Sequence, residues 1–268
     1  MKARPGPSLA ELRAVVQPDA VLARSNAEHW TGTLYMRRLS LYLTWLLVRT
    51  PITANGVTAL MIVCGFLAGP ALLLPGIWGP LVAALLAQLQ MFFDCCDGEV
   101  ARWRGTSSPR GVFLDQIGHF LAEGSIGLFL GLRAAEFLGG TGSVSWQLAF
   151  AGALLLAGIW FNKALNQMVV LARSNAGLGM LADTAATRAL PRGSVVAKFR
   201  SLARFIPFHR IYHSIEMTLI IFVASLLTLG GVSQNAVDLA LMLVFGIAIW
   251  LVILGHWVAI WKSSKLDA

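Results

Sequence analysis

Three aspartates and one histidine stand at helical spacing within a short part of the chain, residues 94–119. On a helix with about 100° per residue, Asp94 and Asp97 fall on one narrow face, and Asp115 and His119 share a face of the following helix. The loop between these helices is short enough to make them antiparallel neighbours. Converging carboxylates repel each other unless a cation holds them, and carboxylate ligands favour Mg²⁺ or Mn²⁺. The three aspartates are therefore predicted metal ligands.

The residues beside this cluster suit a ligand that carries phosphate. Gly98 shares the face of Asp94 and Asp97 and leaves room for a nucleotide to approach the helix backbone. Mg²⁺ in such sites usually binds substrate phosphates as well. The imidazole of His119 suits a general base that takes a proton from an acceptor hydroxyl. A metal, a phosphate and a base together predict phosphotransfer chemistry.

The cluster resembles the motif of the CDP-alcohol phosphatidyltransferase family, D-x2-D-G-x2-A-R-x8-G-x3-D-x3-D. The matching positions, with the eight-residue spacer intact, are Asp94, Asp97, Gly98, Ala101, Arg102, Gly111 and Asp115. The resemblance implies that a phosphoalcohol group passes from a CDP-alcohol to a hydroxyl acceptor while CMP leaves. It also implies a homodimer, and nucleotide contacts through Asp94, Gly98, Ala101, Arg102, Gly111 and Asp115.

One motif position differs, because His119 stands where the family has its fourth aspartate. In the family this residue helps to hold metal and is thought to deprotonate the acceptor, so the resemblance gives His119 both roles. The exchange removes one negative charge, which should weaken Mg²⁺ binding and favour Mn²⁺. Glu123, one helical turn further, is a candidate for the missing carboxylate. A variant that binds nucleotide without catalysis is the other interpretation.

One branch of the family looks closest, and two alternative functions stay open. Residues 37–58 and 97–102 look closest to the branch that includes di-myo-inositol phosphate phosphate synthases. The donor is alternatively CDP-diacylglycerol, which would make the chain a phosphatidyltransferase of the phosphatidylinositol phosphate or phosphatidylglycerophosphate type. A reading from another class is a non-catalytic membrane scaffold or a transporter.

The composition predicts an all-α polytopic membrane protein. The chain has 268 residues, 57% hydrophobic and 13% charged, whereas soluble domains carry about 25% charged residues. Crossing a bilayer takes about 20 apolar residues, and six spans are expected at about residues 54–74, 81–102, 112–132, 146–171, 215–229 and 237–261. Residues 34–48 suit an amphipathic helix at the membrane surface, with a seventh crossing as the alternative. One membrane domain is expected over residues 34–262, between an N-terminal segment (1–33) and a tail (263–268).

The distribution of charge predicts the orientation in the cell membrane. The formal net charge is +8, and basic residues concentrate before the first span and after the second, fourth and sixth spans. The loops on the other side hold one basic residue, Arg133. The positive-inside rule then places both termini and the active site at the cytoplasmic side. The same rule accounts for the charge without a nucleic acid partner.

Polar residues of the fourth and fifth spans are candidates for binding the acceptor: Asn162, Lys163, Asn166, Arg173 and Arg210. Arginine is the natural partner of a phosphate. The alternative is hydrogen bonding between helices, with Lys163 reaching toward the interface. His209, His213 and Glu216 share a face at the start of the fifth span, where interfacial anchoring is favoured over a second metal site.

Overall fold

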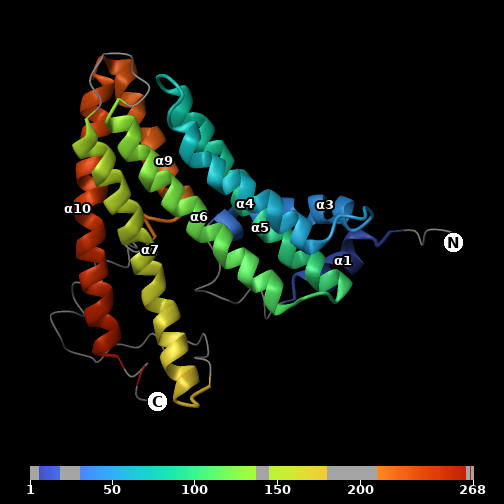
Figure 1. Cartoon of the computed structure of the whole chain (residues 1–268). Coiled ribbons are helices and arrows are strands. Elements are labelled where there is room, and N and C mark those ends of the chain that lie inside the picture. The colour runs from blue at the N-terminus through green and yellow to red at the C-terminus, as the bar shows by residue number, and fades with distance from the viewer. Residues whose placement is uncertain (1–5, 19–30, 137–144, 180–209, 264–265, 267–268) are drawn as a thin grey trace. The chain divides into compact units, whose positions relative to one another are not determined.

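The computed structural model describes residues 6–18, 31–136, 145–179, 210–263 and 266. Within these residues all regular structure is helical, which confirms the all-α class. The helices in chain order are α1 (Leu9–Val16), η1 (Gly32–Met36), α3 (Arg37–Leu47), α4 (Ala54–Ala71), α5 (Trp78–Arg104), α6 (Pro109–Ala134), α7 (Trp146–Asn175), α9 (Ser214–Ser225), η3 (Leu226–Gly230) and α10 (Gln234–Trp261) (Figure 1). They form two compact units, Met1–Ala68 with Leu85–Ala122, and Gly69–Ala84 with Glu123–Ala268.

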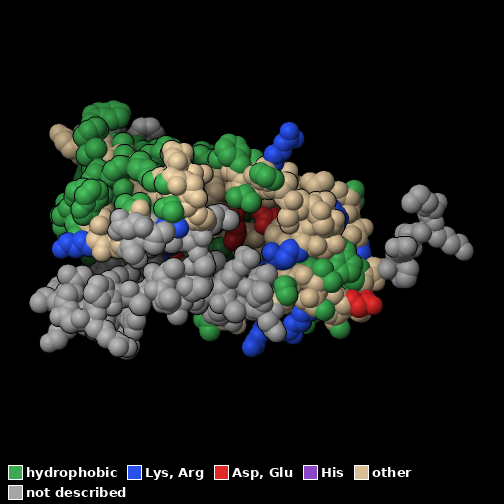
Figure 2. Space-filling model, turned by 90° about the horizontal axis from the view of Figure 1, so that it is seen from below, with side chains coloured by type: hydrophobic (Ala, Val, Ile, Leu, Met, Phe, Trp, Pro, Cys, Tyr) green, Lys and Arg blue, Asp and Glu red, His purple; other side chains and the backbone are tan. Residues whose placement is uncertain are grey.

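In the part of the chain that the structure describes, four helices are long and apolar enough to cross a membrane: α4, α5, α7 and α10. Large hydrophobic residues such as Leu243, Ile247 and Leu251 are exposed on α10, and Figure 2 shows broad areas of hydrophobic side chains on the surface. Side chains of this kind lie at a protein surface without cost where the surroundings are lipid. The chain is therefore an integral membrane protein, and its exposed apolar helices are the surface that lipid covers.

The other two predicted spans are helical but do not have the same character. Helix α6 has 26 residues, but polar residues stand within its apolar sequence. Helix α9 has 12 residues and continues only into the five residues of η3. The count of six crossings thus stays a prediction, although all six predicted segments form helices.

Helix α3 and its π-helical start coincide with the predicted surface helix. At 11 residues, α3 falls short of the length that a crossing needs, which disfavours the seventh span. Its polar residues Ser40 and Thr44 are buried, while Leu39, Tyr42 and Leu46 are exposed. A helix with its apolar side outward suits a lipid boundary, and the location of α3 at the membrane surface stays a prediction.

The N-terminal segment contains a short, well-capped helix. The hydroxyl of Ser8 accepts from the Glu11 backbone N–H at 3.2 Å, and the Ser8 backbone N–H and hydroxyl both donate to the Glu11 carboxylate. This capping box begins α1, and the donated hydrogen bonds lower the pKa of Glu11. Leu12 and Val16 are buried against Leu41 of α3, so α1 packs against α3 within the first unit.

The first unit brings its membrane helices close together at small residues. A side chain at Gly65 of α4 would lie 2.7 Å from the Ala122 methyl of α6. A side chain at Gly118 of α6 would meet the Met61 side chain of α4 at 2.4 Å. Small residues let helix backbones approach in membranes, and here they set α4 against α6.

In the second unit, α10 packs against α7 and α9 (Figure 1). Helices α6 and α7 approach each other closely at two glycines, since a side chain on Gly131 would lie 2.3 Å from the Gly152 Cα atom. Backbone contact of this kind leaves no room for even a methyl group.

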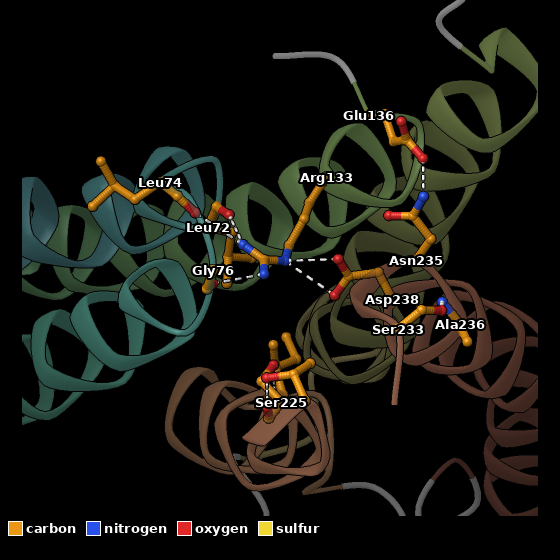
Figure 3. Close-up of polar contacts among 12 residues, drawn as sticks. Leu72, Leu74, Gly76, Arg133, Glu136, Ser225, Ser233, Asn235, Ala236 and Asp238 are labelled. Carbon is orange, nitrogen blue, oxygen red and sulfur yellow. Dashed lines mark hydrogen bonds and ion pairs between the residues drawn. The ribbon is translucent and has the colours of Figure 1, made fainter. Parts of the chain in front are cut away.

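A buried ion pair links three segments of the second unit (Figure 3). The Nε atom of Arg133 donates to both carboxylate oxygens of Asp238 at 3.0 Å, and the two side chains are 4% and 2% exposed. Its other nitrogens donate to the Leu72, Leu74 and Gly76 carbonyls in the turn after α4. Arg133, which was predicted to lie in a loop, is therefore a buried cross-link between α6, α10 and this turn.

Replacing Asp238 by alanine should destabilise the protein, because it leaves the Arg133 charge buried without its carboxylate. We expect the free energy of unfolding to fall by about 3–5 kcal/mol, measured by thermal unfolding in detergent. Asn235→Ala is the control, since Asn235 is exposed and its side-chain amide donates to the Glu136 carboxylate; its effect should stay within about 0.5 kcal/mol. Equal melting temperatures for Asp238→Ala and the wild type would show that the ion pair contributes nothing.

Candidate metal and donor site

The polar end of α5 and the start of α6 are joined by a tight turn. Gly105 has φ +64°, a left-handed conformation that glycine adopts without strain, and it ends α5 as Thr106 N–H donates to the Ala101 carbonyl at 2.9 Å. The hydroxyl of Ser108 then accepts from the Gly111 N–H at 3.2 Å, and Pro109 takes the first helical position. This stop and start make α5 and α6 antiparallel neighbours, as the sequence predicted.

Asp94, Asp115 and His119 converge across the two helices. Their potential ligand atoms all lie within 4.8 Å of one another. The Nε2 atom of His119 lies 3.3 Å from Asp94 Oδ1 and 3.5 Å from Asp115 Oδ1, and the three side chains are 19–31% exposed. Two carboxylate oxygens and one imidazole nitrogen form a donor set that suits Mg²⁺ or Mn²⁺. The residues present therefore fit a divalent ion.

Asp97, the remaining predicted ligand, is held from a third helix. Its Oδ2 atom accepts from the Thr58 hydroxyl of α4 at 2.6 Å, and its residue is 9% exposed. Asp97 is not part of the three-residue group. Thr58 was not among the predicted site residues, and the structure makes it the hydrogen-bond partner of a motif aspartate.

The predicted nucleotide residues of α5 lie around Arg102. A side chain at Gly98 would meet the Arg102 guanidinium at 3.2 Å, so glycine lets this group lie along the helix. The Nε atom of Arg102 donates to the Val16 carbonyl of α1 at 2.7 Å. Ala101 is partly buried on the same helix. Gly111 lies near Asn55, whose Oδ1 atom would be 3.5 Å from a side chain there.

Both ring nitrogens of His119 have neighbours. While Nε2 faces the two carboxylates, Nδ1 lies 3.5 Å from the Gln90 amide nitrogen. Gln90 is fully buried. A ring held on one side by an amide can present its other nitrogen to a metal in a fixed orientation.

Sequence reasoning missed the role of Glu99, which stands between Gly98 and Val100 in the motif stretch. Its carboxylate is fully buried and accepts hydrogen bonds from four side chains. The donors are Gln17 at 2.8 Å, Ser40 at 2.8 Å, Thr44 at 2.7 Å and Arg37 at 3.5 Å. No spacing rule points to these partners, because all of them come from the distant N-terminal helices.

The acceptor candidates belong to the second unit and do not share one environment. Asn162 is buried and its Oδ1 atom lies 2.9 Å from His256 Nδ1, whereas Asn166 is exposed. Arg173 is buried and donates to the Gly179 carbonyl through Nε and Nη2, at 3.1 and 2.9 Å. Arg210 lies in the turn before α9.

Glu123 contacts a lysine and a histidine. Its Oε1 atom accepts from Lys163 Nζ at 2.8 Å and lies 3.2 Å from His213 Nδ1. This buried carboxylate is not part of the three-residue ligand group, so the structure gives it partners other than those expected of a fourth metal ligand. His213 precedes α9, and His209 lies outside the described residues.

The model of the CDP-alcohol phosphatidyltransferase family matches residues 51–264, most of the chain. The chain belongs to the CDP-alcohol phosphatidyltransferase family. Members of this family are transferases of substituted phosphate groups that use divalent metal ions, and they move a phosphoalcohol group from a CDP-alcohol. No curated protein matches the chain. The match covers α4 to α10 and thus both motif helices, while α1 and α3 precede it.

For this family member, Asp115→Asn should weaken metal binding, because an amide replaces a charged carboxylate ligand. We expect the dissociation constant for Mn²⁺ to rise at least about tenfold, followed by the loss of the free-ion electron paramagnetic resonance signal during titration. Glu136→Gln makes the same change at a carboxylate in the second unit that bonds to Asn235, and it should bind Mn²⁺ like the wild type. Equal Mn²⁺ affinities in all three proteins would contradict the assignment of Asp115.

Proposed function

We propose that the chain transfers a phosphoalcohol group from a CDP-alcohol to a hydroxyl acceptor at the cytoplasmic membrane surface, using a divalent ion held by Asp94, Asp115 and His119. The observation that carries this proposal is the convergence of these three side chains, from two helices inside the matched region, within 4.8 Å. Asp97 completes the acidic cluster, oriented by the Thr58 hydroxyl. When bound, the ion neutralises charge on the donor pyrophosphate.

The chain's own residues orient the donor around this centre. Gly98 keeps the α5 backbone open to the nucleotide, and Arg102 offers guanidinium nitrogens beside it. Ala101 on α5 and Gly111 on α6 belong to the same surface for the CDP-alcohol. The acceptor is assigned to the polar residues of α7 and the following segment, Asn162, Lys163, Asn166, Arg173 and Arg210. The protein is expected to act as a homodimer.

The contacts of His119 favour the ligand role over the base role. Its Nε2 atom faces two carboxylates, and its Nδ1 atom faces buried Gln90. A base must offer a ring nitrogen to the acceptor, so metal ligation through Nε2 and proton transfer compete for the same atom. We therefore assign His119 primarily as a ligand, and the imidazole in place of a carboxylate favours Mn²⁺ over Mg²⁺.

The overall proposal is tested by CMP release from the purified protein with CDP-glycerol and CDP-diacylglycerol as donors, each supplied with glycerol 3-phosphate or myo-inositol 1-phosphate as the hydroxyl acceptor. CMP release that requires Mn²⁺ or Mg²⁺ is expected with at least one of them, and a lipid-soluble product would identify the phosphatidyltransferase type. Asp97→Asn should lower the rate at least about 100-fold. A folded, metal-loaded wild type that releases no CMP from any donor would favour the non-catalytic scaffold.

Two substitutions at His119 separate its two roles. Asparagine keeps an oxygen that can ligate metal but removes the base, so His119→Asn should stay within about tenfold of the wild-type rate with Mn²⁺, whereas loss of a base costs about 10²–10⁴-fold. His119→Asp restores the family's carboxylate and should keep or raise the rate with Mg²⁺. Rates of CMP release are the measurement. A folded His119→Asp protein without activity would mean that His119 has a distinct role.

A further inference from the structure

The motif helix α5 has a second polar side, at which Glu99 is the central residue. With about 100° per residue, Glu99 is rotated by about 200° from Asp97 and so points away from the acidic cluster. Its fully buried carboxylate accepts four side-chain hydrogen bonds, given above, from residues between Gln17 and Thr44. All four donors precede the region that the family model matches, residues 51–264.

Arg102, one helical turn after Glu99, also connects α5 to the N-terminal helices. Its Nε atom donates to the Val16 carbonyl, which is one of the last carbonyls of α1 and has no partner within that helix. The adjacent Gln17 donates to the Glu99 carboxylate at 2.8 Å and to the Arg37 carbonyl at 2.7 Å. One end of α1 thus contacts both Glu99 and Arg102.

Helix α1 is itself anchored at its other end. The Pro7 carbonyl accepts from Trp45 Nε1 at 2.8 Å and from Arg49 Nη2 at 3.1 Å, and the Arg49 guanidinium stacks on the Trp45 ring at 3.3 Å. With Leu12 and Val16 packed against α3, α1 has little freedom to rotate. Contacts at both ends make it a rigid support for the back of α5.

We propose that α1 and α3 form a positioning element that fixes the rotation of α5 and the direction of the Arg102 guanidinium, with Glu99 as its positioning residue. This inference rests on the proposed function, because Arg102 is assigned there to the nucleotide. Glu99 touches no substrate in this account. It acts by holding the face that carries Gly98 and Arg102 toward the donor while the metal ligands keep their own geometry.

The test measures the dissociation constant of CMP in the presence of Mn²⁺, together with the Mn²⁺ affinity and the melting temperature. Glu99→Ala should weaken CMP binding about tenfold, as expected when a charge-assisted hydrogen bond is misplaced. Gln17→Ala should weaken it about threefold, because the same carboxylate loses one of its donors. Glu99→Gln keeps an acceptor for Gln17 and Ser40, and the Thr44 hydroxyl can accept from its amide, so affinity should stay near that of the wild type.

Gln147→Ala is the matched control, since Gln147 lies at the start of α7 in the second unit and should not change CMP affinity. Weaker CMP binding in Glu99→Ala and Gln17→Ala, with unchanged Mn²⁺ affinity and rescue by Glu99→Gln, supports the positioning role. If Glu99→Ala does not fold, Gln17→Ala decides. The positioning role is overturned if the folded Glu99→Ala and Gln17→Ala proteins bind CMP with wild-type affinity. It is also overturned if Gln147→Ala weakens CMP binding as much as they do.

CMP release is measured in parallel to keep the two proposals distinct. A wild type that binds CMP but releases none from CDP-alcohols contradicts the proposed function, and the ranking of the variants still decides the positioning role. A wild type that binds no CMP contradicts both.

Discussion

Like-charged carboxylates repel strongly when they are only a few ångströms apart and partly shielded from water. The first unit brings Asp94 and Asp115 together in this way, with the imidazole of His119 between them. The surrounding structure serves this convergence: Gly105 ends one helix, Ser108 begins the next, and Thr58 orients Asp97 from a third. A cation is the natural counterpart of such a cluster, and the family to which the chain belongs uses divalent metals.

Several buried polar contacts in this protein join helices on sides that lie away from the proposed site. Glu99 ties α5 to the N-terminal helices, and Arg133 ties α6 to α10 and to the turn after α4. In both cases the buried charge is surrounded by donors or acceptors, which is the condition for burying it at all. Packing of apolar helices alone discriminates poorly between rotations about their axes, and polar cross-links of this kind define one rotation.

The sequence was sufficient for features that depend on local pattern. Runs of apolar residues predicted the positions of α4, α5, α7 and α10, and fixed spacing predicted that Asp94, Asp115 and His119 meet. It was insufficient where partners lie far apart along the chain. Arg133 was interpreted as a loop residue because its partner Asp238 is 105 residues away in the sequence. No pattern near Glu99 predicts a hydrogen-bond donor 82 residues earlier. Asn162 and Asn166 are four residues apart, a spacing that puts both on one face of a helix, yet Asn162 is buried and Asn166 is exposed, since exposure depends on what packs alongside.

The most direct test of the central claim is a crystal structure with Mn²⁺ and CMP, with the ion located by its anomalous scattering. The account predicts an anomalous peak within about 2.0–2.3 Å of an oxygen of Asp94, an oxygen of Asp115 and a nitrogen of His119. It also predicts the CMP phosphate beside that peak. A structure in which these three side chains hold no ion, with CMP bound away from α5, would contradict it.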